Sequence, residues 1–198
     1  MQELDPKWIR VSTILAMIPS QNMAGKWEYP MGKIDPFVLE RKANLGTSVH
    51  EAIYADSQDK FCAISDKEDG YLDSYLKWKR EIKLKPIHSE QRLFHEPMRL
   101  TGCVDMIAKF GIDDDLCLID FKCTVAEDPV KWQLQAAFYH FLACHANIPV
   151  NDRCFFVKLD PEGKMPKVYQ YWIGKELTAT ALSFYNAYTF LTRKYGSI

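Results

Sequence analysis

The sequence predicts a mixed α/β (α+β) fold. Apolar residues at helical spacing and short strand-like runs follow one another as helices, a run of three strands, a helix, two strands and a closing helix. The 198 residues are 47% hydrophobic and 26% charged, which provides enough apolar material for one core. We therefore expect a single domain over 1–198, with an N-terminal helical part (1–85), a core (86–173) and a closing helix (174–198).

Two helices are predicted before the strands. Ser48 and Glu51 fit the S-x-x-E capping box that is typical of a helix start, and apolar residues follow at helical spacing. This start places His50 in the first helical turn. Residues 71–85 repeat apolar side chains at helical spacing and predict the second helix.

The strands come next. Residues 89–110 and 116–124 are strand-like and are joined by "GIDDD" (111–115), a pattern that predicts a hairpin with a glycine-containing loop. Asp128 and Pro129 are typical of the N-cap and first position of a helix. The remaining predicted elements are a second hairpin over 153–160 and 167–173 and a helix over 175–195.

Composition restricts the setting in which the chain works. The formal net charge of −1 gives no overall basic surface, so any contact with nucleic acid must be local. The six cysteines show no CxxC pair and no zinc-like spacing, which favours reduced thiols in a reducing compartment. The sequence shows neither a signal nor a transit peptide and no apolar run of membrane-spanning length. We expect a cytoplasmic protein with no membrane partner, located in the host cytoplasm if the chain is viral.

One strand carries an acid and a base on the same side. In "LIDFKCT" (118–124), Asp120 and Lys122 are two residues apart, and residues at that spacing point to one face of a strand. A hairpin would bring Asp105, 15 residues before Asp120, to a neighbouring position. Two such carboxylates repel each other and lose hydration if buried, and a hard divalent cation removes both penalties. Lys122 would then orient a water molecule or stabilise charge on a phosphate, which favours phosphodiester hydrolysis.

A simpler interpretation of the same spacing stays open. Asp120 and Lys122 would equally form a surface ion pair on an edge strand, with little energetic effect. The pattern D-x-K does not distinguish the two, so the surrounding motifs have to decide.

Several short motifs occur in one order along residues 8–173. They are "RVSTIL", "LGTSVHEAI" with G-x-x-x-H, "SEQRL", "GCVD" with G-x-x-D, "DFK" with D-x-K, and "QAAFY" with Q-x-x-x-Y. None of them is specific alone. Together the series resembles the PD-(D/E)XK nuclease superfamily, and within it the RecB-like branch of phage-type and mitochondrial genome maintenance-type exonucleases.

The resemblance implies a restriction-endonuclease-like core, in which helices flank a central mixed β-sheet, and a metal site. It implies that Asp105 and Asp120 bind the catalytic metal, with the main-chain carbonyl of Phe121 as a further ligand. His50 would be the additional metal ligand of the RecB-like branch, and Lys122 the catalytic lysine. The expected ion is Mg²⁺ or Mn²⁺, since a histidine ligand also suits Mn²⁺.

The resemblance also implies roles around the metal. Gln135 and Tyr139 would shape the site and touch DNA, and Glu90 would lie beside the metal ligands or at a second metal. Lys131, Gln135 and Tyr139 follow i, i+4, i+8 spacing, so they form a helical stripe that would serve as a track for a phosphate backbone. The alternative is an ordinary solvated helix face. No iron–sulfur cluster is expected, because no cysteine follows Cys154 and no close cysteine cluster exists.

The implied function is a Mg²⁺- or Mn²⁺-dependent DNA exonuclease. It would hydrolyse phosphodiester bonds to 5′-phosphate products during DNA replication, recombination or repair, as in phages. Its partners would be DNA ends, single- or double-stranded, with a recombination or replication protein as a further candidate. Two alternatives remain: an endonuclease of the same superfamily, and a catalytically inactive relative that binds nucleic acid.

Overall fold

The computed structural model describes residues 7–21, 27–28, 36–60, 62, 65–111, 114–124 and 126–195. In chain order its elements are β1 (Ile9–Arg10), α1 (Val11–Ala16), β2 (Ser20–Gln21), β3 (Trp27–Glu28), α2 (Pro36–Ser57), α3 (Asp66–Glu81), β4 (Leu84–His95), the 3₁₀ turn Glu96–Met98, β5 (Leu100–Phe110), β6 (Leu116–Lys122), α4 (Pro129–His145), β7 (Val150–Lys158), β8 (Lys167–Trp172) and α5 (Lys175–Tyr195). The predicted mixed sheet with flanking helices is confirmed. The division into 1–85, 86–173 and 174–198 stays a prediction.

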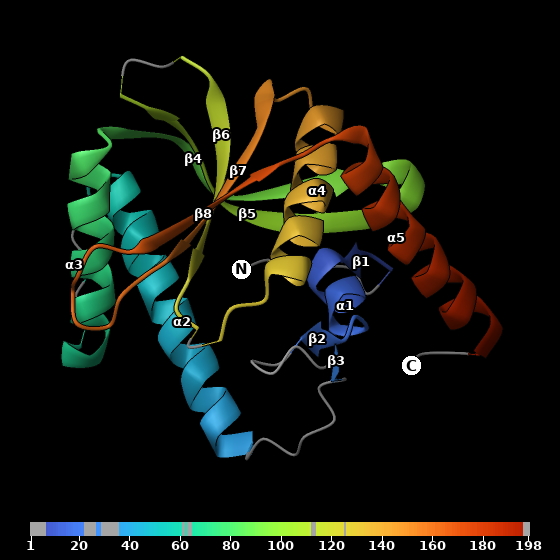
Figure 1. The fold of residues 1–198 in the computed structure, drawn as a ribbon, viewed down its shortest axis with the longest axis horizontal. Helices are drawn as coiled ribbons and strands as arrows, with labels where there is room; N and C mark the ends of the chain where they lie inside the picture. The colour runs from blue at the N-terminus through green and yellow to red at the C-terminus, as the bar shows by residue number, and fades with distance from the viewer. Residues whose placement is uncertain are drawn as a thin grey trace.

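The main sheet has six strands in the described chain (Figure 1). Its order is β1–β5–β6–β7–β8, with β4 paired along the other edge of β5. The pairs β1/β5 and β6/β7 are parallel, and the other pairs are antiparallel. Both predicted hairpins, β5/β6 and β7/β8, are therefore confirmed.

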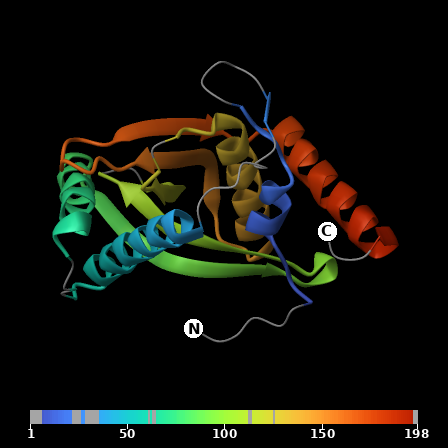
Figure 2. The same cartoon turned by 90° about the horizontal axis from the view of Figure 1, so that it is seen from below.

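Helices cover both faces of this sheet (Figure 2). Helices α1, α4 and α5 pack against one face around Leu118 and Phe138. Helices α2 and α3 pack against the other face around Ile119 and Phe121. Because side chains alternate in direction along β6, its even-numbered residues, including Asp120, face α4. Phe121 faces the other way and packs edge-on against Tyr75 of α3, with 5.4 Å between ring centroids.

Strands β5 and β6 separate at the centre of the sheet. Their paired residues extend only over Met106–Ala108 and Cys117–Ile119. Further along, the same edge of β5 pairs with β1 at Leu100–Thr101. Asp105 and Asp120 are the next residues beyond the paired segment, so both lie where the two strands diverge.

The structure corrects two helix starts. Helix α2 begins at Pro36 and not at Ser48, so His50 lies about four turns into the helix and not in its first turn. The S-x-x-E pattern fell within a helix, and the better signal was "DP" at 35–36, the same pattern that correctly predicted the start of α4 at Asp128–Pro129. Helix α3 runs over Asp66–Glu81 and not 71–85, because Glu68 caps its start by accepting a hydrogen bond from the Ser65 backbone at 2.9 Å.

The strand ends also differ from the prediction. Strand β4 begins at Leu84 and not at residue 89, and β6 ends at Lys122 and not at residue 124.

None of the helices in the described part of the chain combines the length and apolar character that crossing a membrane requires.

Candidate active site

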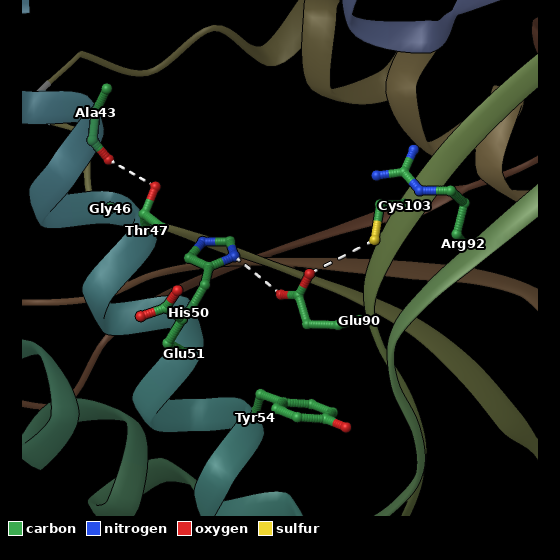
Figure 3. Close-up of a pocket in the computed structure, with 9 residues that line it drawn as sticks. All are labelled: Ala43, Gly46, Thr47, His50, Glu51, Tyr54, Glu90, Arg92 and Cys103. Carbon is green, nitrogen blue, oxygen red and sulfur yellow. Dashed lines mark hydrogen bonds and ion pairs between the residues drawn. The ribbon is translucent and has the colours of Figure 1, made fainter. Parts of the chain in front are cut away.

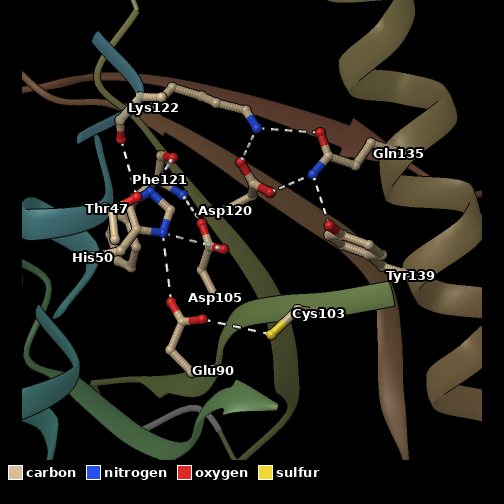
Figure 4. Close-up of polar contacts among 11 residues, drawn as sticks. Thr47, His50, Glu90, Cys103, Asp105, Asp120, Phe121, Lys122, Gln135 and Tyr139 are labelled. Carbon is tan, nitrogen blue, oxygen red and sulfur yellow. Dashed lines mark hydrogen bonds and ion pairs between the residues drawn. The ribbon is translucent and has the colours of Figure 1, made fainter. Parts of the chain in front are cut away.

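Five elements bring the candidate residues together (Figure 4). His50 comes from α2, Glu90 from β4, Asp105 from β5, and Asp120 and Lys122 from β6. Helix α4 adds Gln135 from the opposite side. Residues that are distant in the sequence therefore meet at the point where β5 and β6 diverge.

His50, Glu90 and Asp105 form one half of the site. The His50 Nδ1 atom lies 3.5 Å from Glu90 Oε1 and 3.5 Å from Asp105 Oδ1. One ligand atom from each of the three residues lies within 4.8 Å of the others, close enough for all of them to hold one cation. Glu90, expected only as an accessory residue, therefore belongs to this cluster by its position.

The hydrogen bonding of His50 shows what this cluster requires. His50 Nε2 lies 3.2 Å from the Phe121 carbonyl oxygen, so a proton on Nε2 donates there. The lone pair of Nδ1 then faces two carboxylate oxygens, and three acceptors pointing at one another repel. Either a proton on Nδ1 or a metal cation removes that repulsion. The set of one imidazole and two carboxylates suits a divalent metal such as Mg²⁺ or Mn²⁺.

The pKa directions follow from the same geometry. Burial lowers the pKa of His50, but the charge of Asp105 and the hydrogen bonds to Asp105 and Glu90 outweigh burial and hold it well above 6.5. Burial raises the pKa of Asp105, but His50, Lys122 and the Phe121 N–H outweigh burial and leave it below 3.8. In the absence of a cation, the proton held on His50 takes its place electrostatically.

The backbone of Glu90 is in the left-handed region. Its φ is +50°, in the middle of strand β4, where a residue with a Cβ rarely adopts that conformation. This backbone geometry orients the Glu90 carboxylate. One of its oxygens contacts His50, and the other accepts a weak hydrogen bond from the Cys103 thiol at 3.5 Å. A strained residue beside a cluster of possible metal ligands is typical of a functional site.

Asp120, Lys122 and Gln135 form the other half of the site. Asp120 Oδ2 lies 2.6 Å from Lys122 Nζ, and Asp120 Oδ1 accepts a hydrogen bond from Gln135 Nε2 at 2.7 Å. Gln135 Oε1 accepts from Lys122 Nζ at 3.2 Å, so the three side chains form a closed ring of contacts. The side chain of Asp120 is only 2% exposed and that of Lys122 is 19% exposed. The alternative of a surface pair on an edge strand is therefore wrong, since β6 lies between β5 and β7.

Burial and the neighbouring charges together set the pKa values of Asp120 and Lys122. Burial and the nearby Asp105 carboxylate raise the pKa of Asp120 to about 7, despite the attraction of Lys122. Burial lowers the pKa of Lys122, but Asp120 and Asp105 outweigh burial and raise it above 10.5. Lys122 therefore stays protonated at neutral pH.

The predicted stripe on α4 does not form one exposed face. Tyr139 is buried, and its hydroxyl accepts a hydrogen bond from Gln135 Nε2 at 3.0 Å. Its ring lies against Gly102, where an added Cβ would come within 2.8 Å of Tyr139 Cε1. Lys131 Nζ donates to Ser20 Oγ at 2.7 Å. The solvated-face alternative is wrong for Gln135 and Tyr139, which face into the protein and support Asp120.

Cys103 is a site neighbour that the sequence analysis did not single out. It lies two residues before Asp105 on β5, so the spacing that paired Asp120 with Lys122 also placed Cys103 beside Asp105. Burial and the charge of Glu90 raise the pKa of the Cys103 thiol to about 12, which keeps it protonated. It therefore acts as a hydrogen-bond donor to Glu90.

Residues 62–182 match the family model described as the PD-(D/E)XK nuclease superfamily. The chain belongs to this superfamily. Nuclease chemistry is the class of activity that this membership supports, and nucleases of this superfamily use divalent metals, consistent with the cluster of His50, Glu90 and Asp105. The RecB-like branch is consistent with the motifs present.

Two solved structures are similar to this chain. An alkaline exonuclease from Laribacter hongkongensis is 13% identical with a TM-score of 0.48, and the alignment covers 95% of this chain and 93% of that one. A protein from Eubacterium rectale described as an exonuclease is 11% identical with a TM-score of 0.49, covering 100% of this chain and 89% of that one. No curated protein sequence matches the chain significantly. The assignment rests on the family model.

Proposed function

We propose that this protein is a Mg²⁺- or Mn²⁺-dependent deoxyribonuclease that acts as an exonuclease and leaves 5′-phosphate products. The observation that supports this most strongly is the convergence of Asp105, Asp120, Lys122 and His50 where β5 and β6 diverge. Two carboxylates, a buried ammonium group and an imidazole in one place are costly to a fold and suited to phosphodiester hydrolysis. The proposed setting is DNA replication, recombination or repair.

His50, Asp105 and Glu90 are the residues that would hold the metal in the present arrangement, with Asp120 joining when its carboxylate turns from Gln135. The Phe121 carbonyl is a further proposed ligand, although it accepts from His50 here. A bound divalent cation supplies Lewis-acid stabilisation of negative charge on the phosphate oxygens.

Lys122 acts as a cation in this proposal. Asp120 and Asp105 keep it protonated in the absence of a metal, so in that state it is not a base for the attacking water. Its ammonium group instead aligns that water and stabilises negative charge on the reacting phosphate by hydrogen bonding. Gln135 bonds to both Asp120 and Lys122 and so fixes their relative positions.

The deciding experiment is digestion of end-labelled single- and double-stranded DNA with Mg²⁺, Mn²⁺ or EDTA. The wild type is expected to release labelled products with either metal and none with EDTA. Asp120→Ala and Lys122→Ala are each expected to lower the rate by about 100-fold or more, the usual loss for a group that stabilises a charged transition state. Lys109→Ala serves as the control, since in the described part of the chain this lysine pairs with the exposed Asp114 and with no residue of the site.

Two outcomes would replace the proposal. Cleavage of covalently closed circular DNA would identify an endonuclease, because an exonuclease requires an end. Metal-independent DNA binding without hydrolysis would identify an inactive relative. Variants at Asp120 and Lys122 that cleave as fast as the wild type would show that the chemistry lies elsewhere.

A further inference from the structure

A cavity of about 520 Å³ adjoins the metal-binding cluster. Helix α2 forms one wall of it, and strands β4 and β5 form the other (Figure 3). His50 and Glu90 belong both to this cavity and to the proposed metal site. A ligand in the cavity therefore lies directly beside the position where a phosphate would react.

The walls combine groups that suit a nucleoside. Tyr54 is 42% exposed, and its ring offers a flat aromatic surface. The guanidinium of Arg92 and the carboxylate of Glu51 make no hydrogen bond or ion pair with any residue in the part of the chain that the structure describes, so both remain available to a ligand. An aromatic face, a cation and an acceptor are the groups that bind a base, a phosphate and the hydrogen-bond donors of a base or sugar.

Gly46 keeps this cavity open. It lies within helix α2, where glycine is unfavourable by about 0.5–1 kcal/mol relative to alanine. An added Cβ at Gly46 would meet nothing within 4 Å, so neither packing nor backbone conformation requires a glycine there. The missing side chain leaves space on the α2 wall that a larger residue would fill.

Size and position limit what can enter. The volume lies in the range of about 300–1,000 Å³ that holds one small organic ligand. The cavity lies between a helix and two strands of the sheet, so a base that enters it is separated from a complementary strand. Base and sugar must therefore leave the duplex before they can occupy it, as in enzymes that extrude a nucleotide.

We propose that this cavity receives one unpaired nucleoside next to the scissile phosphate, with Tyr54 contacting the base and Arg92 the adjoining phosphate. This rests on the proposed nuclease function and extends it, because it makes an unpaired nucleotide at the cleavage position the substrate. Single-stranded DNA and frayed ends are then cleaved faster than a fully paired blunt end.

The structure supplies a direct test through Gly46→Phe, which fills the cavity without removing any side chain. Gly174→Phe is the matched control, since an added Cβ there also meets nothing within 4 Å and Gly174 lies before α5. On end-labelled single-stranded DNA with Mg²⁺, Gly46→Phe is expected to be at least about 10-fold slower, while Gly174→Phe matches the wild type. Tyr54→Ala is expected to lose about 10- to 100-fold, the effect of removing one stacked base contact.

Binding of dTMP, thymidine and inorganic phosphate, measured calorimetrically with Mg²⁺, separates the two ends of the proposed ligand. The wild type is expected to bind dTMP more tightly than phosphate. Arg92→Gln is expected to weaken the binding of dTMP but not of thymidine, and Gly46→Phe to weaken the binding of both.

Circular dichroism checks folding, and Tyr54→Ala with Arg92→Gln carries the test if Gly46→Phe does not fold. The inference is overturned if these variants bind dTMP and cleave single strands like the wild type, or if blunt paired ends are cleaved as fast as single strands. A wild type that binds dTMP but degrades no DNA would overturn the proposed function instead.

Discussion

Replacing Asp120 with asparagine should stabilise the metal-free protein while abolishing its activity. Asp120 is only 2% exposed, and burial together with the Asp105 charge raises its pKa to about 7 from an ordinary 3.8. A raised carboxyl pKa means that the folded state holds the ionised form less favourably than the unfolded chain does. Asparagine keeps the shape and can still accept the hydrogen bond from Gln135, but it carries no charge.

The size of the effect follows from the pKa difference. A change from 3.8 to about 7, at about 1.4 kcal/mol per pKa unit, gives at most about 4 kcal/mol. The loss of the Lys122 pair offsets part of this gain, although Lys122 is 19% exposed and can turn toward water. We expect Asp120→Asn to be about 1–3 kcal/mol more stable than the wild type at pH 7.5 in EDTA.

The pH dependence provides the diagnostic sign. Below about pH 4 both states of the wild type hold the Asp120 proton, whereas between about pH 4 and 7 only the folded state does. The Asp120 contribution to wild-type stability therefore falls as pH rises through that interval and is constant above it. Urea unfolding in EDTA at pH 5 and 7.5 should show the advantage of Asp120→Asn growing with pH. If the variant is less stable at pH 7.5 by an amount unchanged at pH 5, the carboxylate is stabilising and the reasoning is refuted.

Three further outcomes are expected. Excess Mg²⁺ or Mn²⁺ should stabilise the wild type and raise its melting temperature. At 100 times the dissociation constant the free energy of unfolding should rise by about 2.7 kcal/mol, and much less in His50→Ala. Gly70→Ala should lower stability by about 1–3 kcal/mol, because its Cβ would lie 1.8 Å from the Pro161 carbonyl oxygen, whereas Gly46→Ala should raise it by about 0.5–1 kcal/mol. Tyr75→Phe should cost about 1.5–3 kcal/mol in urea unfolding, since the buried hydroxyl donates to Asp56 at 2.8 Å.

Local patterns in the sequence were enough for most of the elements around the site. The alternation in β6 correctly placed Asp120 and Lys122 on one face, and the hairpin spacing correctly placed Asp105 near Asp120. These inferences succeeded because strand periodicity and short turns are local properties of the chain. The prediction for the start of α2 was wrong because an S-x-x-E pattern is equally compatible with a helix interior, where no free N–H groups need capping.

What the sequence could not predict depends on contacts between distant segments. The position of Glu90 beside His50 depends on the pairing of β4 with β5 and on a left-handed φ, neither of which leaves a local signal at a glutamate. The burial of Tyr139 likewise depends on Gly102, 37 positions earlier, which leaves room for the ring. The helical spacing of Lys131, Gln135 and Tyr139 could not by itself show that the sheet covers part of this helix face.

The divergence of β5 from β6 explains why the acidic groups gather there. Where the two strands stop pairing, the Phe121 N–H no longer meets a β5 carbonyl, and Asp105 Oδ2 accepts its hydrogen bond at 2.7 Å instead. Asp105 is thereby fixed by the backbone of the strand that carries Asp120, so the two carboxylates cannot separate to relieve their repulsion. A bound metal cation would relieve it without breaking the hydrogen bond to Phe121, in addition to the charges of Lys122 and protonated His50. The divergence of the two strands therefore holds Asp105 and Asp120 close together, in an arrangement that suits a metal ion.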